Sequence, residues 1–173
     1  MGVKSNSVSI SISQVQPGDE VQFLDAAARS RDLFEDWVNP PSNPERFAEH
    51  LAKYSAGNNF SYLARTNQAQ IIGCININEI VRGAFQSAFL GYYAFSPHNG
   101  KGLMKQAMAL VISEAFGQHQ LHRLEANIQP SNLASIALVK SLGFRLEGHS
   151  ARYLKIDGQW RDHDRYAITV EEW

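Results

Sequence analysis

Residues 99–104 combine glycine and lysine at a spacing that could bind an anion. Gly100 and Gly102 flank Lys101, and a long segment with a helical stripe of apolar residues follows directly. The first turn of a helix presents unpaired backbone N–H groups and a partial positive charge, and glycine lets the backbone approach a ligand closely. With the charge of Lys101 added, these residues predict a phosphate or pyrophosphate site. A tight turn that binds nothing is the alternative, because short glycine motifs are weak signals.

Two widespread phosphate-binding patterns do not fit this loop. The Walker A pattern needs Ser or Thr after a Gly-Lys pair, and Gly102 stands there instead. The dinucleotide fingerprint G-x-G-x-x-G needs Gly or Ala where the sequence has Lys105, although Glu125 lies about where a ribose-binding acid would. That fold alternates strands and helices, whereas three strand-like segments in a row precede this loop. A Rossmann interpretation is therefore disfavoured.

Hydrophobic periodicity predicts the elements that position the loop. Helical stripes of apolar residues predict helices at residues 21–37, 45–54, 102–119 and 133–142. Apolar runs between turn residues predict strands at residues 8–13, 60–65, 70–81, 88–95, 123–128, 144–156 and 166–170. Short connections between the second, third and fourth strands favour an antiparallel meander. This element order is typical of an α+β (mixed α/β) layer.

Composition and charge exclude several classes of protein. The chain has 173 residues, a length typical of one domain, which we assign to residues 1–173 with a flexible tail at residues 1–7. The formal charge of −1 lacks the basic surplus of a DNA-binding domain. No apolar run approaches the roughly 20 residues of a membrane-spanning helix, and the sequence shows no secretory signal. A single cysteine fits a reducing compartment, so we expect a cytoplasmic protein with no DNA and no membrane partner.

Several reactive residue types are interpreted as structural. Cys74 lies in an apolar strand, where a free cysteine is usually a small buried hydrophobe. His119 and His122 are three residues apart without a third ligand nearby, so we expect a solvated pair at a helix end and no metal site. His163 stands in a run of charged residues, and we expect a structural charge cluster there.

Two segments resemble the GNAT family of acetyltransferases. Residues 99–104 resemble the acetyl-CoA pyrophosphate loop of that family, with Asn99 in place of the usual Gln or Arg and Met104 in place of the last small residue. Residues 132–135, followed by the Leu-Gly-Phe ending at residues 142–144, resemble the family's next helix.

A third segment, residues 157–163, resembles the RimJ/RimL-type branch of the family, whose members acetylate the N-termini of ribosomal proteins. The resemblance as a whole implies the GNAT fold. In that fold a central, mostly antiparallel twisted sheet of about seven strands is flanked by about four helices.

The resemblance also implies where acetyl-CoA, the cosubstrate, would bind. In GNAT proteins the strand before the loop diverges from its neighbour and its free backbone groups bind the pantetheine arm, while N–H groups of the loop bind the pyrophosphate. Two further residues match positions near the thioester. Carried over to this sequence, the expected binding residues are Tyr93, Ala94, Phe95, Asn99, Gly100, Lys101, Gly102, Leu103, Met104, Asn132 and Ser135.

Acetyl transfer to an amine needs a proton acceptor and a group that stabilises the departing thiolate. By the resemblance, the amine attacks the thioester directly through a tetrahedral intermediate. We predict Ser135 as the donor to the thiolate, with an ordinary helix N-cap role as its alternative. Glu79 is the predicted base, with a solvated strand-end carboxylate as its alternative. Tyr153 is a further catalytic candidate, because it occupies the region where a relative uses a carboxylate.

The resemblance therefore implies an acetyl-CoA-dependent N-acetyltransferase that acts on the N-terminal α-amine of a protein, expected to be a ribosomal protein. Two alternatives stay open: the same fold acting on a small amine such as a polyamine, an amino acid or an aminoglycoside, or a non-catalytic module that binds an acyl-CoA or the ribosome. We also expect ribosome association, and a monomer or a homodimer. We expect Phe23, Phe34, Trp37 and Tyr54 of the N-terminal helices to pack in the core. Because that region also shapes the acceptor groove in GNAT proteins, Phe34 or Trp37 facing the acceptor is the alternative.

Overall fold

The computed structural model of the chain describes residues 9–34 and 37–173. The flexible tail expected at residues 1–7 lies outside the described residues. Among the described residues, no helix is long and apolar enough to cross a membrane. No group of three or more His, Cys, Asp or Glu side chains in that part of the chain lies close enough together to hold a metal ion.

Seven strands form one sheet in the order β1-β2-β3-β4-β5-β7-β6. Every neighbouring pair is antiparallel except β4 and β5, which are parallel. This mixed, mostly antiparallel sheet confirms the expected fold class. The strands are β1 (Ile10–Gln14), β2 (Phe60–Thr66), β3 (Ile71–Val81), β4 (Ser87–Ala94), β5 (Arg123–Ile128), β6 (Arg145–Ile156) and β7 (Gln159–Thr169).

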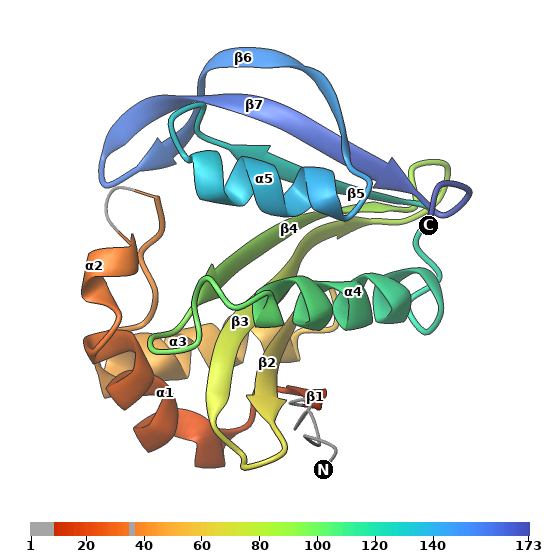
Figure 1. Ribbon diagram of the computed structural model, residues 1–173. Coiled ribbons are helices and arrows are strands. Elements are labelled where there is room, and N and C mark those ends of the chain that lie inside the picture. The colour runs from red at the N-terminus through yellow and green to blue at the C-terminus, as the bar shows by residue number, and fades with distance from the viewer. Residues whose placement is uncertain (1–8, 35–36) are drawn as a thin grey trace, which may run out of the picture.

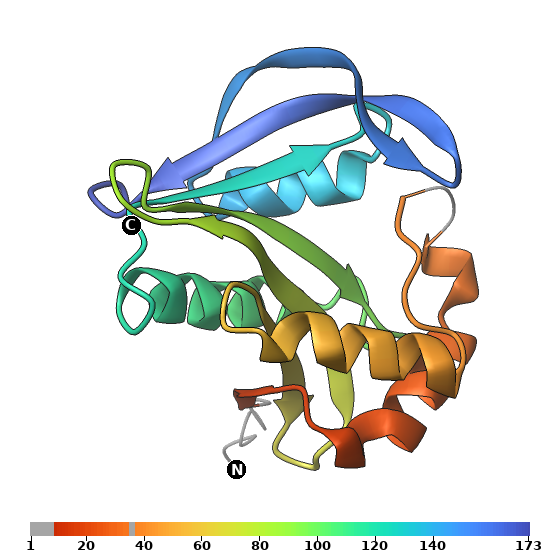
Figure 2. The same ribbon diagram turned by 180° about the vertical axis from the view of Figure 1, so that it is seen from behind.

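Helices cover both faces of the sheet. Figure 1 shows the face that carries α4 and α5, and Figure 2 shows α3 lying across the opposite face. The described helices are α1 (Glu20–Ala28), α2 (Arg31–Phe34), α3 (Pro44–Ser55), α4 (Leu103–Phe116) and α5 (Leu133–Ser141), with a short 3-10 turn, η1 (Pro17–Asp19), before α1. We call the side with α4 and α5 the α4/α5 face and the other side the α3 face.

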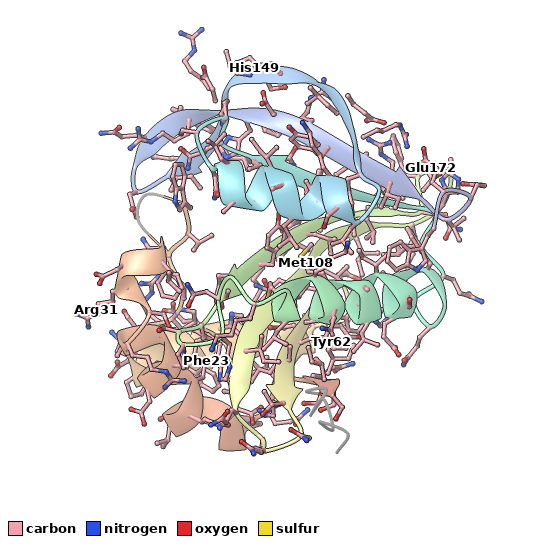
Figure 3. All side chains as sticks on the ribbon, in the orientation of Figure 1. Phe23, Arg31, Tyr62, Met108, His149 and Glu172 are labelled. Atoms are coloured by element: carbon pink, nitrogen blue, oxygen red, sulfur yellow. The ribbon has the colours of Figure 1, made fainter. Side chains whose placement is uncertain are left out.

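Side chains that alternate along β4 pack into two separate hydrophobic cores. Tyr92 packs against the core beneath α4, which includes Met108, whereas Tyr93 packs against the core beneath α1 and α3, which includes Phe23. Figure 3 labels one member of each core, Met108 and Phe23. Successive side chains of a strand point to opposite faces, so neighbouring residues of β4 lie on opposite sides of the sheet.

Two predicted elements differ from those observed. The helix expected at residues 21–37 is divided at Ser30, whose hydroxyl donates to the Ala26 carbonyl at 2.6 Å and accepts from the Ser96 N–H at 2.9 Å. With this division, the described residues form five α-helices instead of about four. The last strand begins at Gln159, not at residue 166. Charged residues at 161, 162, 164 and 165 fall on both faces of the strand and interrupt its apolar alternation, which concealed its first half.

The expectation of a solvated histidine pair was wrong for one member. His119 is only 7% exposed, and its Nε2 lies 2.7 Å from the Tyr62 hydroxyl. His122 is exposed and pairs with Glu171. Cys74 is a fully buried free cysteine, as predicted.

Candidate active site

The two central strands diverge, which opens the sheet. β4 pairs with β3 as far as Ala94, but it pairs with β5 only from Ser87 to Phe89. Residues 90–94 therefore have no strand partner on the β5 side. An extended ligand that carries amide groups can complete such an unpaired strand edge. This is the backbone geometry expected at Tyr93 and Ala94.

The loop after β4 meets the requirements of an anion site. Gly100 and Gly102 adopt φ values of 72° and 73°, which L side chains rarely adopt, and a Cβ at either position would meet only open space. Gly102 is the N-cap of α4 and supplies no side-chain hydrogen bond, and the first turn carries no acidic residue. The first N–H groups of this helix are therefore available to a ligand.

Positive charge gathers around the same loop. The Arg29 Nε donates to the Ser96 carbonyl at 2.8 Å, which holds this guanidinium beside the segment. The pKa of His98 is lowered by burial and by the nearby charges of Lys101 and Arg29. A helix N-terminus with two cations nearby, Lys101 on the loop and Arg29 after α1, favours an anion of high charge.

A cavity of about 90 Å³ lies where β4 and β5 diverge. It brings two of the predicted residues, Asn132 and Ser135, together with residues from β4, β5, β7 and the segment after α2. The lining residues are Trp37, Val38, Leu90, Gly91, Tyr92, Ala126, Asn127, Ile128, Gln129, Asn132, Ser135 and His163.

On the α4/α5 face, the cavity carries two hydroxyl groups in contact. The Ser135 Oγ lies 2.5 Å from the Tyr92 hydroxyl. Burial raises the pKa of Tyr92 to about 12, although its bond to Ser135 opposes that rise, so the phenol stays protonated and can donate. The Asn132 side chain accepts from the Ser135 N–H at 3.1 Å and caps α5. Asn132 is thus the N-cap of α5, and both Asn132 and Ser135 line the cavity.

On the α3 face, the cavity carries Asn127 and His163. Asn127 is paired with Arg165 in the β5–β7 register, and residues directly opposite in a sheet share a face. His163 precedes Arg165 by two positions, so it lies on the same face as Asn127. Tyr92 belongs to the other face, beneath α5. The cavity therefore joins the two faces of the sheet.

His163 has one ring nitrogen engaged and one available. Its Nδ1 lies 3.0 Å from the Arg161 carbonyl oxygen, which can only accept, so Nδ1 carries the proton. The side chain is 3% exposed, and burial lowers its pKa although Asp162 and Asp164 oppose this. The neutral ring thus leaves Nε2 as an acceptor. The charge cluster expected here is present, but His163 is buried within it.

Two of the predicted catalytic residues lie outside the cavity lining. Glu79 is exposed at an irregularity of β3 with a φ of 51°, and its N–H donates to the Asn59 side chain at 2.8 Å. The Tyr153 ring lies 6.2 Å from the His163 ring, measured between centroids. The roles predicted for Glu79 and Tyr153 stay predictions.

The aromatic residues of the N-terminal helices divide into core and cavity. Phe34 is buried and meets the rings of Tyr93 and Phe95 edge-on, so it belongs to the core. Trp37 lines the cavity. Of the two residues that were candidates to face an acceptor, Phe34 and Trp37, the geometry therefore favours Trp37.

A family model named "Acetyltransferase (GNAT) domain" matches residues 10–145, which include the diverging strands and the glycine loop. The chain belongs to the GNAT family. GNAT proteins are acetyltransferases, so this chain is an enzyme of that class. Its seven-stranded sheet and flanking helices are the fold of the family.

Curated relatives within the GNAT family carry acetyltransferase names. A Bacillus subtilis protein named "Probable N-acetyltransferase YjcK" is 31% identical over 169 residues, covering 92% of this chain and 93% of its own length. The Escherichia coli "[Ribosomal protein uS5]-alanine N-acetyltransferase" is 41% identical over 107 residues, covering 62% of this chain and 55% of its own length.

Solved GNAT structures share the fold over nearly the whole chain. The structure titled "Mycobacterium smegmatis RimJ in complex with CoA-disulfide" has a TM-score of 0.84 and 30% identity, covering 94% of this chain and 83% of that one. A Vibrio fischeri ribosomal-protein-S5-alanine acetyltransferase has a TM-score of 0.82 and 26% identity, covering 95% and 94%.

The sequence did not reveal three residues of the cavity: Tyr92, Asn127 and His163. One signal was available for Asn127, because β5 alternates buried and half-buried residues and this polar residue falls at a half-buried position. The run of charges around His163 hid its burial. Tyr92 could be assigned only once α5 was known to lie over it.

Proposed function

We propose that this GNAT enzyme transfers an acetyl group from acetyl-CoA to the N-terminal α-amine of a protein. The observation that carries the proposal is the cavity where β4 and β5 diverge, which is lined by residues from both faces of the sheet. A donor and an acceptor that enter from opposite faces meet there, which converts a bimolecular reaction into an intramolecular one.

Backbone groups of the loop and of β4 would bind the donor, acetyl-CoA. The pyrophosphate of acetyl-CoA would lie on the N–H groups of residues 100–104, beside Lys101 and Arg29. The unpaired edge of residues 90–94 would then take the amide-bearing pantetheine arm toward the cavity. The Mycobacterium smegmatis structure, whose title gives a CoA disulfide in the complex, supports this cosubstrate.

The thioester sulfur would lie beside Ser135. As the amine nitrogen bonds to the acetyl carbon, the carbon–sulfur bond breaks and the sulfur needs a proton. The Ser135 hydroxyl, in contact with the Tyr92 phenol at 2.5 Å, can supply a hydrogen bond or a proton there. This is the role predicted for Ser135 from the sequence.

A protein N-terminus as acceptor is supported by the names of relatives. Those at 41% and 26% identity are named for alanine acetylation of a ribosomal protein. We propose a ribosomal protein in the cytoplasm as the acceptor; ribosome association and the monomeric or homodimeric state stay predictions.

An acceptor screen tests the proposed function. Purified protein is incubated with acetyl-CoA and peptides that begin with Ala, Ser or Met, and free thiol is measured while mass spectrometry locates the acetyl group. We expect thiol release with an Ala or Ser peptide and none with the same peptide blocked at its N-terminus. The proposed acceptor would be contradicted if none of the peptides caused thiol release, or if a small amine were acetylated with a far higher kcat/KM than any peptide.

A further inference from the structure

We infer that Asn127 and His163 together bind the acceptor amine, and that His163 Nε2 takes the proton which the amine loses on acetylation. This inference rests on the proposed function and names the acceptor side of the same site. It differs from the prediction made from the sequence, which placed the base at Glu79.

The first support is an unsatisfied acceptor in the cavity wall. The Oδ1 atom of Asn127 is buried, and no described residue donates a hydrogen bond to it. Buried polar atoms in folded proteins are nearly always paired, so an orphaned acceptor in a cavity points to a missing donor. A primary amine is such a donor, because its N–H groups can bond to carbonyl oxygens.

The second support is the position and tautomer of His163. Its ring borders the same cavity on the same face of the sheet as Asn127. Because Nδ1–H donates to the Arg161 carbonyl, Nε2 is the ring atom left to accept, and no described residue bonds to it. A neutral amine with two hydrogens matches two acceptors, one amide oxygen and one imidazole nitrogen.

Burial keeps His163 neutral near neutral pH in spite of the carboxylates beside it. Asp162 and Asp164 flank it on β7 and favour the charged form, but both carboxylates are drawn toward His149 of β6, at 3.5 and 2.9 Å. Tyr153 of β6 faces the ring, and burial outweighs the carboxylates, so the pKa of His163 lies below its ordinary value of 6.5.

From the remaining elements, the described groups that share the cavity with His163 are uncharged. Tyr92 of β4 and Ser135 of α5 supply hydroxyl groups, and Trp37 and Val38 supply apolar surface. A neutral histidine can take up a proton, which a charged one cannot.

The proposed step transfers an acetyl group from sulfur to nitrogen, together with two protons. The amine nitrogen forms a bond to the acetyl carbon while the carbon–sulfur bond breaks. One proton passes from the nitrogen to His163 Nε2, and the sulfur takes a proton from the Ser135–Tyr92 pair. Exchange with solvent returns both groups to their starting state, and the products are an amide and a thiol.

The test compares pH profiles of wild type with those of three variants, His163→Gln, Asn127→Ala and Glu79→Gln, and with a matched control, His119→Gln. His119 is also a buried histidine with a pKa lowered by burial, but it lies away from the cavity. The value of kcat/KM for an Ala peptide is measured from about pH 5 to pH 9 and expressed per concentration of unprotonated amine, which removes the titration of the substrate.

We expect wild type and His119→Gln to lose activity below a pKa under 6.5. His163→Gln should lower kcat about 100-fold and abolish this acid limb, with little change in the KM for acetyl-CoA. Asn127→Ala should raise the KM for the peptide about tenfold and keep the limb, because it removes one hydrogen bond to the amine. Glu79→Gln distinguishes the base inferred here from the one predicted from the sequence, because only replacement of the base abolishes the acid limb.

Three results would overturn the inference. One is a His163→Gln variant with near wild-type kcat, and another is an acid limb that disappears only in Glu79→Gln. If His163→Gln does not fold, NMR titration of His163 in wild type gives its pKa directly, and a value that differs from the kinetic limb is the third. Wild type without turnover on any peptide would instead overturn the proposed function and, with it, this inference.

Discussion

Ser135 belongs to the first turn of α5, which Asn132 caps, and it also lines the cavity. Its backbone N–H donates to the Asn132 side chain, which holds the helix start, and the contact with Tyr92 orients its hydroxyl. A donor that is already oriented costs little reorganisation when charge develops on a nearby atom. The pair Ser135–Tyr92 is therefore suited to a departing thiolate.

Replacing Ser135 by alanine should lower kcat about 100-fold, because the donor nearest the leaving sulfur is lost. The KM for acetyl-CoA should change little, since the loop and α4 still bind the diphosphate. Free-thiol release under saturating acetyl-CoA measures kcat. The matched control is Ser141→Ala at the other end of the same helix, where the hydroxyl only bonds the Leu138 carbonyl at 2.8 Å. Equal rates for the two variants would exclude the role of Ser135.

At the scale of single elements, α4 and its preceding loop carry the donor site. Gly102→Asp places a carboxylate at the N-terminus of α4 and forces an L side chain into a φ of 73°. We expect the Kd for CoA to rise at least about tenfold, because the new charge repels the pyrophosphate. Isothermal titration with CoA measures the effect.

The control for this variant is Gly83→Asp. Gly83 also has a positive φ, 69°, and open space around its Cβ, but it lies in the turn between β3 and β4. Backbone strain is thus matched and only the place of the charge differs. If both variants bind CoA equally well, the pyrophosphate does not lie on this helix.

A glycine of β3 sets how closely α4 and β4 approach. A Cβ on Gly73 would lie 2.7 Å from the Met104 sulfur and 2.7 Å from the Tyr93 carbonyl oxygen. Gly73→Ala should therefore lower the free energy of unfolding by about 1–3 kcal/mol through overpacking, measured by urea denaturation. It should also weaken CoA binding, because the backbone of Tyr93 must shift. Gly18→Ala, with no atom within 4 Å of its Cβ, should do neither.

The sequence predicted the elements with strong periodicity and missed those whose surroundings decide them. β5 was predicted with its observed bounds, since its apolar residues alternate without interruption. β7 was predicted at less than half its length, because charged residues on a strand resemble a solvated loop. Asn127 and His163 were missed because their importance comes from residues that lie far away in the sequence.

Titratable groups couple the stability of the whole molecule to pH. Burial, with help from the charge of Lys53, lowers the pKa of His50 to about 4, and burial also lowers that of His119. Between pH 6.5 and pH 4, the unfolded chain therefore binds protons that the folded chain does not. Below pH 4.5, the loss of the Glu147 carboxylate, whose pKa is lowered by Arg123, adds to this effect.

The free energy of unfolding should consequently fall as the pH is lowered from neutral, first through the histidines and then through Glu147. Urea denaturation at a series of pH values measures this dependence. His50→Gln should make the slope between pH 6.5 and pH 4 shallower, whatever its effect on absolute stability. A wild-type stability that does not change over this range would contradict the assignment of buried, neutral histidines.

At the scale of the whole molecule, the proposed reaction requires that two ligands meet at the cavity from opposite faces of the sheet. A crystal structure with CoA joined covalently to the N-terminus of an Ala peptide tests this most directly. We predict the diphosphate on residues 100–104, the sulfur beside Ser135 and Tyr92, and the amide nitrogen within hydrogen-bond distance of Asn127 and His163. A structure in which CoA binds away from α4, or in which the peptide lies on the same face as CoA, would contradict it.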